Sequence, residues 1–356
     1  MERLHIAFFG PANSGKSTLV NTLAGQEVSL VSPIPGTTTD PVRKAIEIPG
    51  LGPCVLIDTA GYDDESPLGA QRRRLSLAVL DEADIAVVLG DSPLFQSLDI
   101  PVIRYAQGEG IGSLIARIAA AAPEREERSL TGNLLKEGDT VVLVMPQDSE
   151  APKGRLILPQ VQVLRELLDR GCNALCCQPS GLQAALDRLR ERPALVITDS
   201  QAFRQVDTLL PRECPLTSFS ILLACAKGDI QTFLEGAGAI DRLQPGDRVL
   251  IAEACTHVPD TEDIGRVKIP ALLRRHVCSG KGGDLGVDIS AGNDFPEDLS
   301  PYRLVIHCGA CVAGSRLVRA RTRKALRAGV PITNYGLALA ALQGILKRVA
   351  IPRIPR

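Results

Sequence analysis

Residues 10–17, GPANSGKS, fit the phosphate-loop pattern G-x-x-x-x-G-K-[ST]. The loop follows the apolar segment 4–9, which we predict to be a buried strand, and it opens a predicted helix over 16–24. Glycines let backbone N–H groups surround a phosphate, and a helix N-terminus adds partial positive charge. An ordinary glycine turn is the alternative. The motif in this context predicts an α/β fold with a nucleotide site.

A second part of such a site lies at the end of the segment 55–61, a predicted buried strand that ends in a loop, where the sequence reads Asp58-Thr59-Ala60-Gly61. Lys16 would reach the β- and γ-phosphates, while Ser17 and Asp58 would hold Mg²⁺. The Gly61 amide could sense the γ-phosphate, so Lys16, Asp58 and Gly61 are the predicted catalytic residues. The predicted nucleotide-binding residues are Gly10, Ser14, Gly15, Lys16, Ser17, Thr18 and Asp58.

These motifs, with PGTTTD at 35–40 between them, resemble the TrmE-Era branch of GTPases. The resemblance implies GTP as the nucleotide and Thr38 as a second Mg²⁺ ligand, with Thr37 as the neighbour that could be confused with it. It also implies that Asn13 marks a potassium-stimulated member. Spacing alone would give only a phosphate site.

The guanine-recognising motif N-K-x-D of a full G domain is absent from the sequence. A short segment separates Asp91 from the predicted strand 100–106, and the following YAQGEGIGSL resembles the loop that normally comes after the N-K-x-D strand. We therefore expect a G domain with one helix-strand unit removed. Losing a charge-assisted pair to the base costs about 2–3 kcal/mol, so we predict a weak or relaxed nucleotide preference.

Strands alternating with helices continue after a polar stretch at 123–132. The fold class is therefore α/β, with three units whose sheets are mostly parallel. We expect a shortened P-loop GTPase-like domain over 1–123, a second unit over 132–205 and a third over 206–356. Further strands are predicted at 83–91, 140–146, 173–179, 194–200, 248–254, 285–290 and 303–309, and helices at 111–121, 160–170, 183–190, 230–243, 270–277 and 315–328.

Composition excludes several classes of protein. The chain of 356 residues has 40 Lys plus Arg against 41 Asp plus Glu, and a net charge of −1 gives no reason to expect bulk electrostatic binding of nucleic acid. No apolar run approaches a membrane span and no cleavable signal pattern is present, so we expect a cytoplasmic protein. Ten Cys in such a chain suggest metal binding or catalysis more than disulfides.

Two cysteine–histidine groups follow predicted strands of the third unit. Cys255 and His257 come after 248–254, and His307, Cys308 and Cys311 come at the end of 303–309. Open parallel sheets place ligands at the carboxyl ends of their strands, so the groups would meet if the strands are neighbours. Three readings stay open: buried core residues, a structural zinc site, and an iron–sulfur cluster on three cysteines with one iron open to a histidine, water or another ligand.

The pattern C-x-H followed later by H-C-x-x-C, on a chain that begins with a TrmE-Era-like domain, resembles the HydF family of [FeFe]-hydrogenase maturation GTPases. Further resemblance lies in TSFSILLACAKGD, LIAEACTH, DIGRVKIP and PITNYG. It implies GTPase, dimerisation (132–205) and cluster-binding (206–356) domains, and a homodimer.

The HydF resemblance also implies a [4Fe-4S] cluster on Cys255, Cys308 and Cys311, with His257 and His307 nearby. The implied activity is delivery of a di-iron precursor to apo-hydrogenase, in company with radical-SAM maturation proteins. The alternative is a TrmE-Era-type GTPase of RNA modification or ribosome assembly with a structural zinc. The remaining basic run, 316–327, is interpreted as a solvated helix face, with docking of an acidic partner as the alternative.

Overall fold

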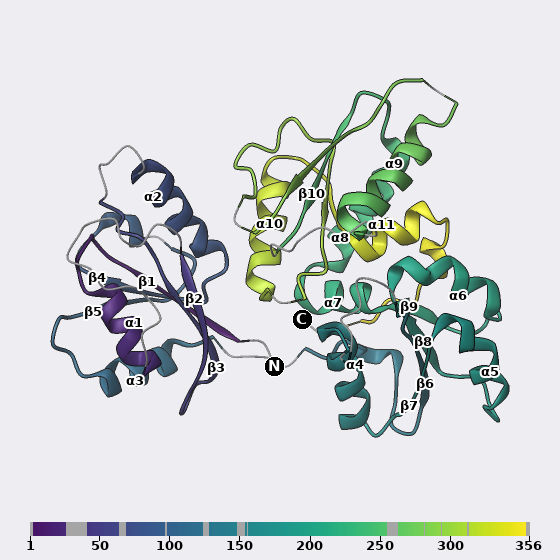
Figure 1. Cartoon of the computed structure of the whole chain (residues 1–356), viewed down its shortest axis with the longest axis horizontal. Coiled ribbons are helices and arrows are strands. Elements are labelled where there is room, and N and C mark those ends of the chain that lie inside the picture. Colours follow the sequence, from purple (N-terminus) through teal and green to yellow (C-terminus); the bar gives the residue numbers. More distant parts are fainter. Residues whose placement is uncertain are drawn as a thin grey trace. The chain divides into compact units, whose positions relative to one another are not determined.

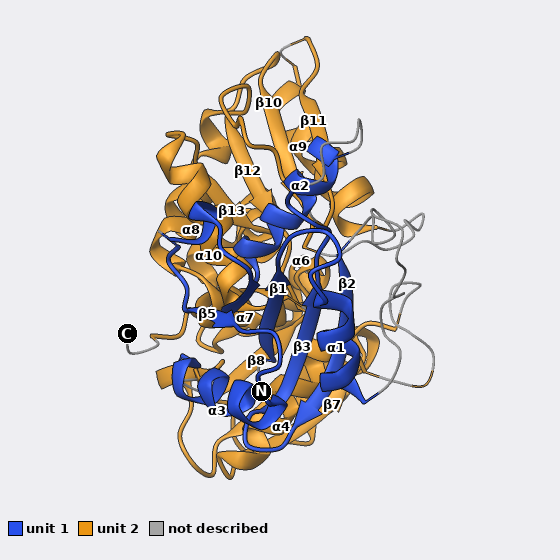
Figure 2. Ribbon diagram, turned by 90° about the vertical axis from the view of Figure 1, so that its left-hand side faces the viewer, with its two compact units in different colours: residues 1–127 blue, residues 128–356 orange. Residues whose placement is uncertain are grey.

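The computed structural model divides the chain into two compact units, residues 1–127 and 128–356 (Figure 2). Each is described by itself. Among the described residues, no helix is long and apolar enough to cross a lipid bilayer. The structure describes residues 3–25, 41–63, 69–96, 98–123, 128–147, 154, 156–254, 263–280, 282–292, 294–311 and 313–353.

The first unit is a five-stranded sheet in the order β2-β3-β1-β4-β5, parallel except for β2. Alternate residues of β1 pack into two cores: Ile6 and Phe8 into one, Ala7 and Phe9 into the other. Burial on both faces explains the continuous apolar run of this strand. The elements are β1 (Leu4–Phe9), α1 (Lys16–Ala24), β2 (Val42–Ile48), β3 (Gly52–Asp58), α2 (Gly69–Ala78), β4 (Ile85–Leu89), β5 (Val102–Tyr105) and α3 (Ile111–Ala121).

The helix-strand unit that we expect to be missing would lie in the connection between β4 and β5. Parallel strands β4 and β5 are neighbours in the sheet. Within the described part of the connection between them, the only regular element is a 3₁₀ turn, Pro93–Phe95. A parallel crossover usually contains a full helix. The strand that leads into the loop resembling the last nucleotide loop of complete G domains is therefore the direct neighbour of β4.

The second unit contains two four-stranded parallel sheets, ordered β7-β6-β8-β9 and β11-β10-β12-β13 (Figure 1). The second sheet of the chain is formed by β6 (Thr140–Val144), β7 (Asn173–Cys177), β8 (Leu195–Thr198) and β9 (Leu216–Ser218). The third sheet is formed by β10 (Arg248–Ala252), β11 (Gly286–Ser290), β12 (Leu304–His307) and β13 (Ile332–Asn334). The helices are α4 (Leu158–Asp169), α5 (Leu182–Asp187), α6 (Phe203–Leu209), α7 (Phe219–Lys227), α8 (Ile230–Gly238), α9 (Ile269–Cys278), α10 (Ser315–Arg327) and α11 (Tyr335–Leu342).

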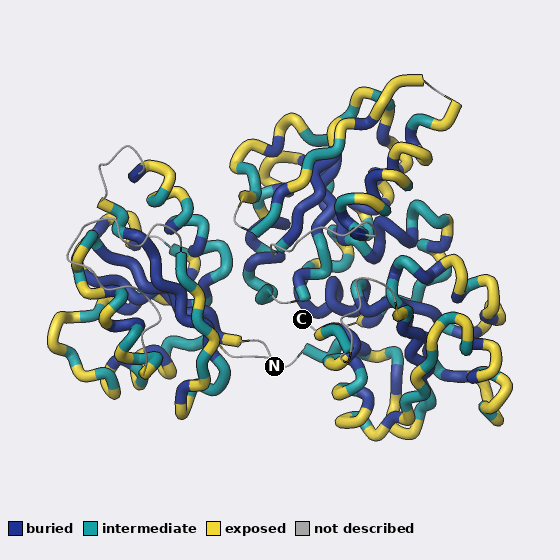
Figure 3. Tube along the Cα trace, viewed as in Figure 1, coloured by how far each residue is buried: buried dark blue, intermediate teal, exposed yellow. Residues whose placement is uncertain are grey.

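Helix α7 connects the two sheets of this unit. It starts directly after β9, where the Ser218 hydroxyl accepts a hydrogen bond from the Ile221 N–H. It contacts α4 on one side and α10 and α11 on the other. A single apolar core contains Val142 of β6 and Leu250 of β10, and the inner strands of both sheets are largely buried (Figure 3). The boundary predicted at 205–206 lies inside α6, and β9 beyond it completes the second sheet.

Candidate functional site

The phosphate loop lies between β1 and α1 and encloses the Lys16 side chain. Asn13 and Gly15 have φ angles of 59° and 92°, so the loop turns through left-handed conformations. Lys16 is 6% exposed and its Nζ donates to the carbonyl oxygens of Gly10 (3.0 Å) and Pro11 (2.6 Å). Burial lowers the pKa of Lys16, whereas the charges of Asp58 and Asp63 raise it. The backbone carbonyl oxygens of the loop thus hold the buried Lys16 ammonium group.

The two predicted Mg²⁺ residues lie side by side: Ser17 in the first turn of α1, and Asp58 at the carboxyl end of β3. Ser17 Oγ donates to Asp58 Oδ2 at 2.6 Å, and Asp58 is fully buried. Gly61 lies against the loop, because an added Cβ would come within 2.7 Å of Ala12 N. The structure brings these residues together with Lys16, and Thr18 lies in the first turn of α1. Thr37, Thr38 and the rest of 35–40 lie outside the described residues.

Asp63 is a member of this site that sequence reasoning missed. Its Oδ1 accepts a hydrogen bond of 2.6 Å from Ala12 N, an amide of the phosphate loop. A carboxylate therefore occupies one donor of a loop built to bind anions. The sequence signal that could have indicated Asp63 is a carboxylate two residues after Gly61.

The loop after β5 is fixed by the Glu109 carboxylate. Arg117 Nη1 lies 2.9 and 3.0 Å from its two oxygens, and Ser113 Oγ donates to it at 3.0 Å. Tyr105 donates its hydroxyl hydrogen to the Glu109 carbonyl at 2.9 Å. These bonds hold the loop without any N-K-x-D residues.

Cys308 and Cys311 begin the loop that follows β12. The Cys308 N–H continues the sheet by donating to the Ala252 carbonyl at 2.9 Å. Cys308 Sγ accepts from the N–H groups of Ala254 (3.1 Å) and Ala310 (3.4 Å), and Ala310 has a left-handed φ of 49°. Hydrogen bonds to sulfur stabilise a thiolate and tune a metal bound to it, so the donor set fits a soft metal such as iron or zinc.

The other predicted ligands, Cys255 and His257, lie outside the described residues. Within the described ranges, no group of three or more His, Cys, Asp or Glu side chains is arranged to hold a metal ion. The described part of the candidate metal site therefore consists of the Cys308–Cys311 loop and its supports. The nine cysteines outside the segment 255–262 are free thiols.

His307 has hydrogen-bond partners at both ring nitrogens. Nδ1 lies 2.7 Å from the Cys308 carbonyl oxygen, and Nε2 lies 3.2 Å from Arg321 Nη1. Burial, reinforced by the charge of Arg321, lowers the pKa of His307 to about 3. The ring is therefore neutral, donating from Nδ1 and accepting at Nε2. Iron could bind His307 only by displacing one of these partners.

Arg321 corrects the interpretation of the basic run as a solvated helix face. Its side chain is 1% exposed, donates to the carbonyls of Glu253 (3.0 Å) and Gly292, and lies 4.9 Å from the Phe295 ring centroid. Arg323 and Arg327 of the same helix are exposed as expected. The prediction failed at Arg321 because carbonyls from loops distant in the sequence satisfy the guanidinium.

A second polar group lies beside Cys308. Glu253 is 2% exposed and accepts from Arg266 Nη2 at 2.8 Å through Oε2. Among the described residues, its Oε1 and the Tyr335 hydroxyl have no hydrogen-bond partner. Burial raises the pKa of Tyr335 well above its usual value, and the negative charges of Cys308 and Glu253 add to this. Neither residue was singled out from the sequence.

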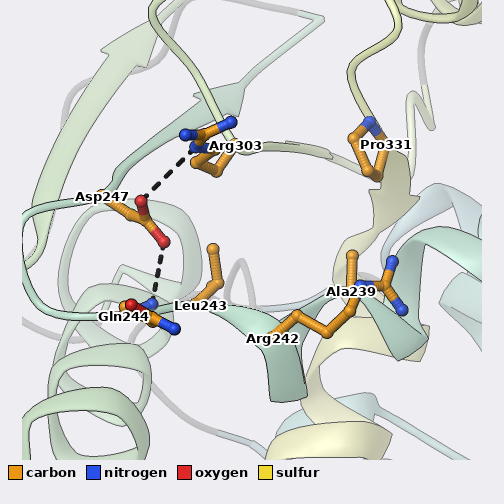
Figure 4. Close-up of a pocket in the computed structure, with 7 residues that line it drawn as sticks. All are labelled: Ala239, Arg242, Leu243, Gln244, Asp247, Arg303 and Pro331. Carbon is orange, nitrogen blue, oxygen red and sulfur yellow. Dashed lines mark hydrogen bonds and ion pairs between the residues drawn. The ribbon is translucent and has the colours of Figure 1, made fainter.

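A separate surface pocket lies at the opposite edge of the third sheet (Figure 4). Asp247 directly precedes β10, and it pairs with Arg303, whose Nε lies 3.5 Å away. The pocket is thus at the amino ends of the strands, whereas Cys308 follows the carboxyl end of β12. It is lined by Ala239, Arg242, Leu243, Gln244, Asp247, Arg303 and Pro331.

Comparison with known families agrees with this organisation. The model of the hydrogen maturase F dimerization domain matches residues 130–228, and that of the hydrogen maturase F tetramerization domain matches residues 231–352. The chain belongs to the hydrogen maturase F family. The HydF resemblance seen in the sequence is thereby confirmed. A third model, described as a 50S ribosome-binding GTPase, matches residues 5–119, so the first unit of this family member is a GTPase domain.

Curated relatives match the chain in part. The tRNA modification GTPase MnmE of Methylobacterium sp. (strain 4-46) is 36% identical over 169 residues, covering 40% of this chain and 36% of the relative. GTPase Der of Caldicellulosiruptor saccharolyticus is 35% identical over 134 residues, covering 36% and 30%. The chain thus spans about a third of the length of these relatives. Among solved structures, Aquifex aeolicus Era is 17% identical, covers 88% of this chain and 99% of its own, and has a TM-score of 0.27.

Proposed function

We propose that the chain is a GTP-hydrolysing maturation protein that holds a [4Fe-4S] cluster and delivers the di-iron precursor of the hydrogenase H-cluster to apo-hydrogenase. The observation that carries this proposal is the combination, in one chain, of a phosphate loop and the Cys308–Cys311 loop of a hydrogen maturase F domain. The partners in the proposal are apo-[FeFe]-hydrogenase, radical-SAM maturation proteins and a second copy of the chain.

In the nucleotide site, Lys16 would exchange its bonds to the Gly10 and Pro11 carbonyls for the β- and γ-phosphates of GTP. Ser17 and Asp58, already 2.6 Å apart, would hold Mg²⁺ together with Thr38. When bound there, Mg²⁺ would supply positive charge to offset the negative charge that develops on the phosphates during transfer. Gly61 would donate its N–H toward the γ-phosphate, and Asn13 would contribute to a potassium site.

Base selectivity is the part of the GTPase reaction that we propose to be weak. No N-K-x-D carboxylate is available, and Glu109 is already occupied by Arg117 and Ser113. We therefore expect fluorescent GTP and ATP analogues to bind with similar affinity. A clear preference for GTP at micromolar concentration would contradict this.

In the cluster site, Cys255, Cys308 and Cys311 are the proposed ligands. A cluster held by three thiolates keeps one iron open, and an open position allows a cargo to bind and leave. His257 is a candidate ligand at that position, and so is His307 after release from Arg321. The free thiols of the described cysteines are consistent with a reducing, cytoplasmic location.

Hydrogen evolution by apo-hydrogenase after incubation with the anaerobically loaded protein tests the delivery step. We expect Lys16→Ala to reduce activation in the presence of GTP, and Cys308→Ser to abolish it. Cys176→Ser, at an exposed position on β7, is the matched cysteine control and should activate like the wild type. Full activation by Cys308→Ser would contradict the proposal.

The alternative function is a GTPase of RNA modification or ribosome assembly with a structural zinc. It is favoured by the relatives, which include tRNA modification GTPases, but the Methylobacterium MnmE covers only 40% of this chain. The two functions differ in the metal that the protein holds.

A further inference from the structure

Lys227, the last residue of α7, is buried against the cysteine loop. It is 7% exposed, although a lysine side chain normally reaches water. Its Nζ lies 2.7 Å from the carbonyl oxygen of Ala310, 3.4 Å from that of Cys311 and 2.9 Å from that of Ala313. An ammonium group has three hydrogens to donate, and these three carbonyls all belong to one loop.

The carbonyls that Lys227 binds determine the shape of this loop. Ala310 adopts a left-handed conformation, which is unfavourable for a non-glycine residue and persists only when its surroundings hold it. The hydrogen bond from Lys227 to the Ala310 carbonyl helps to hold Ala310 in this conformation. The N–H of the same residue points at Cys308 Sγ, 3.4 Å away. Lys227 is thus linked to a predicted ligand sulfur through a single residue.

The charge of Lys227 also acts on anything that the cysteines bind. An ammonium bonded to the Cys311 carbonyl lies in the buried layer beneath the loop, where charges are weakly screened. Reduction adds an electron to a cluster that three thiolates already make negative. A fixed positive charge nearby stabilises the reduced form relative to the oxidised form.

We propose that Lys227 is a positioning residue of the cluster site, which holds the Cys308–Ala313 loop in its ligating shape and raises the reduction potential of the bound cluster. This inference rests on the proposed function, because it requires the cluster. A role confined to packing would affect stability but not the potential.

The test compares Lys227→Met with wild type and with Lys347→Met, a matched loss of charge at an exposed lysine of the same unit. Each full-length protein is reconstituted anaerobically, and iron, sulfide and the midpoint potential are measured, the last by electron paramagnetic resonance during a redox titration. We expect a lower potential in Lys227→Met, or a loss of cluster from a folded chain, and wild-type values in Lys347→Met. A fully loaded Lys227→Met protein with the wild-type potential would overturn the inference.

If circular dichroism shows that Lys227→Met does not fold, the Lys227→Arg variant tests the positioning role instead. Arginine keeps the charge but cannot place three donors on the same three carbonyls from the same position. We expect a potential close to wild type with reduced cluster occupancy and altered g-values. Wild-type occupancy and spectrum in this variant would contradict the positioning role. A wild-type protein that takes up no cluster would instead contradict the proposed function, so the two failures are distinguishable.

Discussion

Replacing Gly236 by alanine should separate α8 from the sheet that carries the cysteine loop. An ideal Cβ on Gly236 would lie 2.0 Å from the carbonyl oxygen of Ile332 and 2.4 Å from its carbonyl carbon. Ordinary carbon–oxygen contacts are about 3.3–3.6 Å, so helix and strand must move apart by about 1 Å. That shift also stretches the bond of 2.8 Å from Thr333 Oγ1 to the Phe233 carbonyl.

The expected loss of stability follows from these contacts. Overpacking costs about 1–3 kcal/mol, and the weakened Thr333 bond adds about 1 kcal/mol. Alanine returns about 1 kcal/mol through its higher helix propensity. The net loss is about 2 kcal/mol, which corresponds to a fall in Tm of roughly 4–8 °C for a unit of this size. Scanning calorimetry of the full chain measures it, with the transition of the first unit identified by its shift on adding nucleotide.

Gly238→Ala is the matched control for this experiment. It lies in the same helix, and nothing is within 4 Å of its added Cβ. We expect its Tm to stay unchanged or rise slightly. Equal Tm values for Gly236→Ala and Gly238→Ala would refute the close packing of α8 on β13.

Three further predictions concern single side chains. Asp63→Asn should tighten binding of a GTP analogue about two- to five-fold in an anisotropy titration, because a neutral amide competes for the Ala12 N–H less strongly than a carboxylate and does not repel the phosphates; weaker binding would contradict this. Ser17→Ala should raise the Mg²⁺ concentration needed for half-maximal phosphate release, because a proposed ligand beside Asp58 is lost; a wild-type Mg²⁺ titration would argue against Ser17 as a ligand. Iodoacetamide should modify the exposed Cys176, and the reaction should become faster as the pH rises. It should spare Cys225, because burial raises the pKa of that thiol to about 12. Detection of modified Cys225 in the folded chain by mass spectrometry would contradict this prediction.

The nucleotide part of the molecule could be predicted from the sequence because its signals are local. The phosphate loop, its strand and its helix are contiguous, and the observed β1 and α1 begin and end as predicted. The strand β2 was missed although its alternating pattern, VRKAIEI, is typical of a sheet edge with one exposed face. The expected loss of a helix-strand unit could be inferred from the short segment after Asp91.

The elements between the second and third sheets could not be assigned in the same way. Helix α7 reads FSILLACAK, and a continuous apolar run buried on all sides has no periodicity that separates helix from strand. The strands β9 and β13 have three residues each, too few for a pattern. Arg321 and Lys227 are buried by carbonyls that lie far away in the sequence, so no spacing rule indicates them.

Metal analysis of the anaerobically purified protein, with electron paramagnetic resonance of the reduced sample, tests the central claim most directly. The account predicts a brown protein with about four irons per chain and a cluster signal that Cys308→Ser loses and Cys176→Ser retains. A colourless protein with one zinc per chain, or an iron signal unaffected by Cys308→Ser, would contradict it.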